Sequence, residues 1–212
     1  MCKNLSEKML HARADASLSS CSQHAGERVG VWHLLGHSAK RDVLTDAYAW
    51  VIATYCAPDA RQFIPALGLD QPTFAKLLAT YFPHFVAPAH WLACQGTLKI
   101  NDTLLDEFTD LLQLLLDHRT LPDEHHRAIA HLVATACMGT DHLWQDLGLP
   151  DRRALSTLLS GHFPALAAKN TGDMKWKKFF YKQLCDREGI NACRAPSCAV
   201  CNDYHKCFGS EE

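Results

Sequence analysis

The sequence contains no apolar run that approaches the roughly 20 residues of a transmembrane helix, and its opening segment Met1–Cys21 lacks the apolar block of a signal peptide. We therefore expect a protein of the cytoplasm that does not cross a membrane. An excess of positive charge is also absent, because Lys+Arg number 21 against 23 Asp+Glu, a net charge of −2 with histidine neutral. A general nucleic-acid binder needs a strong positive excess, so no nucleic-acid partner is expected.

Three motifs of enzyme chemistry are missing as well. The sequence has no G-x-S-x-G nucleophile elbow, no glycine-rich phosphate-binding loop and no H-E-x-x-H zinc helix. These absences disfavour a hydrolase.

Alternating runs of β-branched residues, which are typical of strands, are absent too, and helical periodicity takes their place. Asp42–Cys56 has apolar residues at helical spacing. Asp102–Asp117 carries a wider stripe, as expected for a helix that faces a core; its members are Leu104, Leu105, Phe108, Leu111, Leu112, Leu115 and Leu116. Pro122 with Asp123 and Glu124 suits the first turn of a further helix, since proline needs no donor there and acids face the positive helix end. We therefore predict an all-α protein.

Three regions of the chain differ in composition. The 212 residues suit one domain with an appendage. Residues 1–30 are poor in large apolar side chains and are predicted to form a mobile tail. Residues 31–168 are expected to form the helical body, and residues 169–212 a basic helix followed by a cysteine-rich loop.

The body contains an internal repeat, with copies at about residues 42–85 and 123–166. Val51–Cys56 aligns with Leu132–Cys137, and both copies continue through a Leu-Gly-Leu triplet to a Phe-Pro pair. Glycine after a periodic stretch fits a left-handed helix cap. The pattern predicts a duplicated helical unit that packs with its twin into one bundle, and chance similarity is the alternative.

The sequence is rich in cysteine and histidine, with 10 Cys and 13 His. Cytoplasmic thiols stay reduced, so abundant cysteine there indicates metal binding or catalysis rather than disulfides. Cys56 and Cys137 occupy matching places on apolar helices, which favours small core residues over shared metal ligation. Cys2 and Cys21, in the N-terminal tail, are interpreted as incidental thiols.

Four cysteines with the spacing C-x4-C-x2-C-x5-C lie within fifteen residues near the carboxyl end; they are Cys193, Cys198, Cys201 and Cys207. Thiolates are soft ligands that select iron–sulfur clusters, zinc or copper(I). Zinc modules favour two separated C-x2-C pairs, whereas this motif has one such pair flanked closely by single cysteines. The spacing therefore favours a cluster, with zinc as the first alternative and disulfides as the last.

Two residues beside these four are auxiliary ligand candidates. Cys185 precedes the motif by eight residues, at the end of a predicted helix, where packing is the alternative role. His205 lies inside the motif and could ligate a metal or donate a hydrogen bond.

The helix predicted over Met174–Cys185 is amphipathic and basic. From Lys169 to Arg187 the chain has six basic and two acidic side chains. Lys175, Lys178 and Lys182 share one face, which could attract an oxyanion or dock an acidic partner. An ordinary solvated helix face is the alternative.

Histidines offer a second candidate site around the predicted helix that follows Pro122; they are His118, His125, His126, His131 and His142. Imidazole binds metals when it is neutral and oxyanions when it is protonated. His125 and His126 are adjacent, however, and do not share a helix face well with His131. Solvated or core histidines are therefore the preferred interpretation.

Several of these segments together resemble the NifQ family of nitrogen-fixation proteins. The resemblance lies in Met174–Tyr181, in the four-cysteine motif and in the closing Cys207-Phe208-Gly209, and His142–Leu149 is also similar to that family. It covers roughly residues 40–209.

The resemblance implies an iron–sulfur protein that captures molybdenum on a Mo–Fe–S cluster and donates it to the iron–molybdenum cofactor of nitrogenase. It therefore implies a metal-cluster carrier and not an enzyme. It implies a cluster of the [4Fe-4S] or [3Fe-4S] type on Cys193, Cys198, Cys201 and Cys207. The implied partners are molybdate, the nitrogenase cofactor-assembly scaffold and the nitrogenase iron protein. Two alternatives stay open, namely a helical interaction module with structural zinc and a simple [4Fe-4S] electron carrier.

Overall fold

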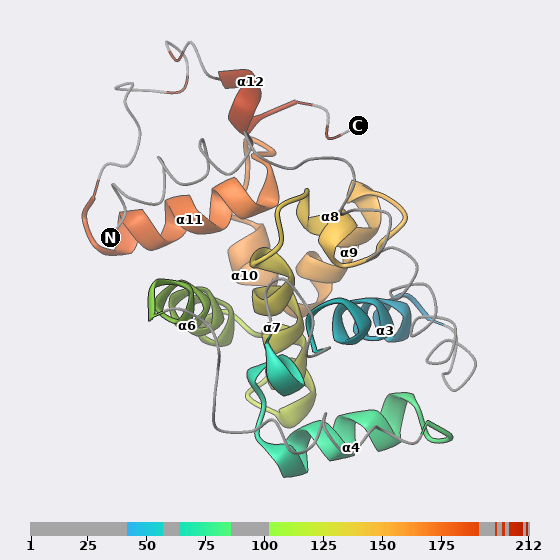
Figure 1. Cartoon of the computed structure of the whole chain (residues 1–212). Coiled ribbons are helices and arrows are strands. Elements are labelled where there is room, and N and C mark those ends of the chain that lie inside the picture. Colours follow the sequence, from blue (N-terminus) through green and yellow to red (C-terminus); the bar gives the residue numbers. More distant parts are fainter. Residues whose placement is uncertain are drawn as a thin grey trace, which may run out of the picture.

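The computed structural model of the chain describes residues 42–56, 64–85, 102–190, 198, 201, 204–209 and 211. These residues are helical with no strand among them, which confirms the all-α prediction (Figure 1). The predicted tail with Cys2 and Cys21 lies outside the described residues, as does Cys193, the first cysteine of the motif. None of the described helices is long and apolar enough to cross a membrane.

The helices carry the labels of Figure 1. In chain order they are α3 (Val43–Tyr55), the 3-10 helix η1 (Pro65–Gly68), α4 (Gln71–Tyr81), α6 (Asp102–Asp117), α7 (Glu124–Cys137), α8 (Leu143–Asp146), α9 (Arg152–His162), α10 (Pro164–Ala167), α11 (Trp176–Arg187) and α12 (Tyr204–Cys207).

α7 is the central helix of the body. Every residue from Ala128 to Met138 is buried, because the helix is apolar or small on all sides and must be surrounded. The helices α3, α6, η1 and α8 pack against it, and Figure 1 shows α6 on one side of α7 and α3 on the other. The stripe predicted on α6 is confirmed, since Phe108, Leu111 and Leu115 are all buried. α11 packs in turn on α6.

Two pairs of helices begin at the same spacing along the chain. Val43 and Glu124 open α3 and α7, and Gln71 and Arg152 open α4 and α9, each pair 81 residues apart. An aspartate caps each helix by accepting the backbone N–H three residues on; the caps are Asp42, Asp70, Asp123 and Asp151. Such caps contribute about 1 kcal/mol each. That the two units arose by duplication stays a prediction.

One local prediction is wrong. Pro122 was expected in the first turn of α7, but the N-cap is Asp123 and the helix begins at Glu124. The carboxylate of Asp123 accepts the backbone N–H of His126 at 2.8 Å. This bond sets the start of the helix one residue after Asp123 and leaves the proline outside.

The glycines of both Leu-Gly-Leu triplets adopt the predicted left-handed conformation, with φ of +72° at Gly68 and +66° at Gly148. At Gly148 a Cβ atom would lie 2.4 Å from the Trp50 side chain, so no other residue fits. The turns before the two glycines differ, since Ala66 and Leu67 also have positive φ in η1 whereas α8 is a regular helical turn.

His131 is a core residue, as the sequence pattern favours. Its Nδ1 lies 2.9 Å from the carbonyl oxygen of Leu67. A carbonyl oxygen only accepts, so Nδ1 carries the hydrogen. Burial lowers the pKa of the His131 imidazole to about 4, and the ring is therefore neutral at pH 7.

We expect His131 to reduce the free energy of unfolding by about 3 kcal/mol between pH 7 and pH 4. The unfolded chain takes up the proton near its ordinary pKa of 6.5, whereas the folded chain takes it up only near 4. Acid therefore favours the unfolded state throughout that window. Urea unfolding at several pH values measures the effect against His131→Gln, which has no imidazole to titrate. The same pH dependence in both proteins would contradict the prediction.

Candidate metal centre

The described part of the cysteine motif is a series of surface turns. The backbone N–H of Cys201 donates to the carbonyl oxygen of Cys198 at 3.3 Å, and that of Tyr204 donates to Cys201 at 3.2 Å. Phe208 then donates to Tyr204 at 3.0 Å, across the short helix α12. These three bonds tie the described residues of the motif to one another through the backbone.

The three described cysteines of the motif lie at the surface. Cys198 is exposed, and Cys201 and Cys207 are half-buried. Among the residues that the structure describes, no three histidine, cysteine or acidic side chains are arranged to hold a metal ion as they stand. The three described ligand candidates of the motif thus do not form a metal-holding group as they stand, and the place of Cys193 lies outside the described residues.

The N-terminal end of α11 holds the fourth cysteine. The backbone N–H of Lys175, the residue before the helix, donates to the carbonyl oxygen of Cys207 at 2.8 Å. The Nζ atom of Lys175 also reaches the carbonyl oxygen of His205 at 3.5 Å. Figure 1 shows α12 directly above this end of α11. Both bonds use backbone oxygens of the residues near the fourth cysteine, so they position the backbone of α12 on this end of α11.

Arg152, on α9, forms ion pairs with Asp173, which precedes α11, and with Glu211, which follows α12. One guanidinium nitrogen lies 2.7 Å from the carboxylate of Asp173 and 3.1 Å from the carbonyl oxygen of Met174, just before α11. The other lies 3.1 Å from the carboxylate of Glu211, which is 8% exposed. The guanidinium thus makes charge-assisted hydrogen bonds to one exposed carboxylate, Asp173, and to one buried carboxylate, Glu211. We call Arg152, Asp173 and Glu211 the Arg152 clasp. No sequence pattern predicts it, because its members are far apart along the chain.

The three cysteines outside the motif that the structure describes are buried; they are Cys56, Cys137 and Cys185. Burial raises the pKa of both the Cys56 and Cys137 thiols to about 12, so each stays protonated, and the Cys56 thiol donates to the carbonyl oxygen of Ile64 at 3.3 Å. The prediction that these two are core residues is confirmed. Cys185, an auxiliary ligand candidate, is 3% exposed on α11.

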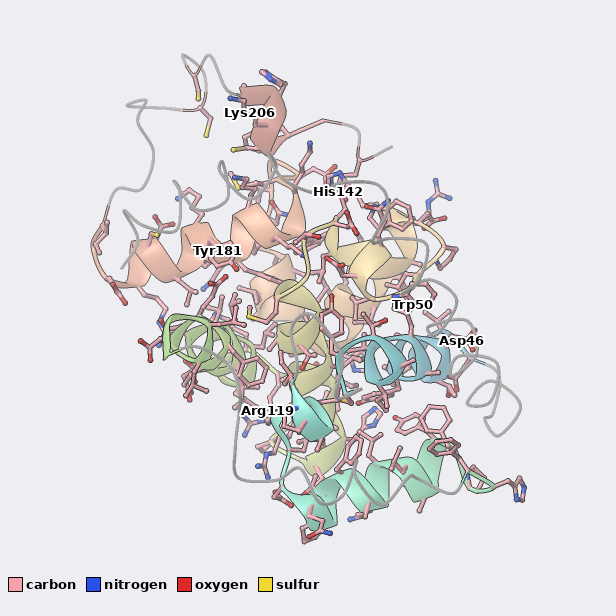
Figure 2. All side chains as sticks on the ribbon, in the orientation of Figure 1. Asp46, Trp50, Arg119, His142, Tyr181 and Lys206 are labelled. Carbon is pink, nitrogen blue, oxygen red and sulfur yellow. The ribbon has the colours of Figure 1, made fainter. Side chains whose placement is uncertain are left out.

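Several basic side chains of α11 form ion pairs. Lys177 is buried and forms an ion pair with Asp146. Lys182 pairs with Asp186 at 2.6 Å, and Arg187 pairs with Asp117 at 3.2 Å. The remaining members of the predicted face, Lys175 and Lys178, are half-exposed. Figure 2 shows how densely side chains fill the space between α11 and the body.

The histidines do not form the group that the sequence outlined. His118 contacts the carbonyl oxygen of Leu114 at 2.8 Å, and His131 lies in the core. His125 and His126 instead join His162, from the last turn of α9. No local sequence signal links His162 to the other two, because α9 and α7 meet only in the folded chain.

Comparison with known proteins gives one consistent match. A family model described as NifQ matches residues 47–209. The chain is 45% identical over 154 residues to "Protein NifQ" of Azotobacter vinelandii, covering 68% of this chain and 78% of that protein. It is 50% identical over 147 residues to "Protein NifQ homolog" of Sinorhizobium fredii, covering 69% of this chain and 62% of that protein. No solved structure matches the chain.

Proposed function

The chain belongs to the NifQ family, and from this premise we propose that it serves nitrogen fixation as a carrier of molybdenum. It takes up molybdenum from molybdate and donates it for the iron–molybdenum cofactor of nitrogenase. The observation that carries this proposal is the family match over residues 47–209, which includes the whole four-cysteine motif. In this proposal the protein binds and hands over its cargo and is not an enzyme.

An iron–sulfur cluster fits the donors of the motif. Cys193, Cys198, Cys201 and Cys207 would hold it, and thiolates are the ligands that such clusters use. The described members are exposed or half-buried, whereas Cys56 and Cys137 are buried as protonated thiols. A bound cluster would supply sulfide ligands and electrons. Molybdenum needs both, because the metal of molybdate must exchange oxygen ligands for sulfur and be reduced.

The exposure of Cys198 suits a carrier, because a ligand at the surface lets a recipient approach the cargo. The bonds from Lys175 to Cys207 and from Arg152 to Glu211 attach the two sides of α12 to the body. Lys175 and Lys178 would attract molybdate by their positive charge, and the same two residues would guide an acidic partner. The recipients in this proposal are the cofactor-assembly scaffold and the nitrogenase iron protein.

We also infer that the body is a duplicated unit whose role is to support this segment. The matching starts of α3 and α7 and of α4 and α9 support that inference. The four aspartate caps at the same spacing support it as well.

Metal analysis of the full chain, purified without oxygen from cells supplied with molybdate, tests the proposed function. We expect a brown protein that contains iron, acid-labile sulfide and molybdenum. A colourless protein with zinc and no iron would overturn the proposal in favour of a structural zinc site. Iron and sulfide without molybdenum would favour an electron carrier and would equally overturn it.

A further inference from the structure

Three imidazole rings form a cluster away from the cysteine motif. His125 and His126 belong to the first turn of α7, and His162 is the last residue of α9. The ring centroids of His125 and His126 are 5.2 Å apart, and those rings lie 5.8 Å and 5.4 Å from the ring of His162. We call this group the histidine cluster. Three rings that bind one tetrahedral ion at about 2.0–2.1 Å have centroids about 5 Å apart, so the spacing suits a shared ion.

His126 already has the orientation of a metal ligand. Its Nδ1 lies 2.7 Å from a carboxylate oxygen of Asp123, and that oxygen also accepts the backbone N–H of His126 at 2.8 Å. A carboxylate only accepts, so Nδ1 carries a hydrogen and the Nε2 of the neutral ring presents its lone pair. Histidines that bind metals usually donate their second ring N–H to a carboxylate in this way.

His162 supplies an unsatisfied donor atom. Its Nδ1 is buried and has no hydrogen-bond partner among the described residues. A buried nitrogen without a hydrogen-bond partner is unfavourable, and a bound metal ion would remove that cost. Burial, together with the neighbouring His126 and His125, lowers the pKa of His162. The ring therefore favours the neutral form, which is the form that binds a metal ion.

The third ring is accessible from solvent. His125 is exposed, and its Nδ1 lies 3.2 Å from the hydroxyl of Tyr81. A groove of about 470 Å³ between α4 and the start of α7 reaches this ring, and Tyr81, Asp123 and Glu124 are among the residues that line it. Lys76, which also lines the groove, pairs with Glu124. With Asp123 beside the rings, the surroundings favour a cation over an oxyanion.

We propose that the histidine cluster binds a divalent transition-metal ion, with Asp123 holding His126 in the ligating orientation. As the described side chains stand, no three of them are arranged to hold a metal. Binding therefore requires the rings to turn about their side-chain bonds, and exposed His125 has room to do so. α4, which borders the groove, lies at the opposite end of the molecule from α12 (Figure 1). The site is thus separate from the cysteine motif and does not depend on the proposed function.

The test uses Zn²⁺ alone and the full chain with the four motif cysteines changed to serine. We expect a single Zn²⁺ per chain in equilibrium dialysis. His162→Gln should weaken binding by about 100-fold or more, and Asp123→Asn by about 10- to 100-fold. Asn caps a helix as well as Asp does, so Asp123→Asn separates metal binding from helix stability. His84→Gln alters an exposed histidine outside the cluster and should leave the affinity unchanged.

Imidazole ¹⁵N NMR of the unsubstituted chain gives a second readout. It does not depend on whether any substituted protein folds. On addition of Zn²⁺, the ring signals of His125, His126 and His162 should shift together. Unchanged signals for these rings would overturn the proposal. So would an affinity for Zn²⁺ that His162→Gln and Asp123→Asn leave intact, or binding of molybdate in place of Zn²⁺.

Discussion

Cys201→Ala is expected to remove iron and molybdenum from the purified protein while the helical body stays folded. The side chain is half-buried at the surface, and a cluster with four thiolate ligands does not survive the loss of a central one. Alanine keeps the backbone N–H and carbonyl that bond to Cys198 and Tyr204, so the turns of the segment do not depend on the thiol. Iron, sulfide and molybdenum assays measure the loss, and circular dichroism measures the helix content.

Cys56→Ala is the matched control, because it removes a thiol by the same substitution in the core. Its thiol is buried, and burial raises its pKa to about 12, which makes it unsuited to ligation. We expect its metal content to equal that of the wild type. Loss of iron from Cys56→Ala, or retention of iron by Cys201→Ala, would show that the motif does not hold the cluster.

The helices of the body could be predicted because their signals are local. The stripe over Asp102–Asp117 identified α6 at its observed bounds, and the left-handed caps followed from the Leu-Gly-Leu triplets. The burial of Lys177 could not be predicted, since its partner Asp146 is 31 residues away in the chain. A lysine among aromatic residues has the same sequence pattern whether its charge lies in water or in a buried ion pair.

The candidate sites also differ in whether their residues are close together along the chain. The cysteine motif is recognisable because its four ligands lie within fifteen residues. The histidine cluster is not, because His162 at the end of α9 meets His125 and His126 at the start of α7 only in the folded chain. The Arg152 clasp likewise connects Asp173 and Glu211, which both contact Arg152 only in the folded chain. Sequence therefore identifies sites that are local in the chain and misses those that tertiary structure assembles.

Lys177→Met is expected to lower the free energy of unfolding by about 3–5 kcal/mol, the usual cost of leaving one charge of a buried ion pair without its partner. The side chains of Lys177 and Asp146 are each 10% exposed. Lys177 also donates to the carbonyl oxygen of Gly139 at 2.9 Å, and Asp146 accepts from the hydroxyl of Tyr55 at 3.3 Å. Burial already raises the pKa of Asp146 against the opposing effect of Lys177. Urea unfolding at pH 7 measures the change.

Two further variants separate the charge from the rest of the side chain. Lys182→Met removes a lysine of the same helix whose pair with Asp186 is about half exposed, and it should change the free energy by no more than about 1 kcal/mol. The double variant Lys177→Met/Asp146→Asn has no unpaired charge, so it should be more stable than Lys177→Met alone. Equal stability of the single and double variants would mean that Lys177 acts by packing. Because α11 begins beside Cys207, loosening this helix should also speed the loss of iron on warming, which Lys182→Met should not do.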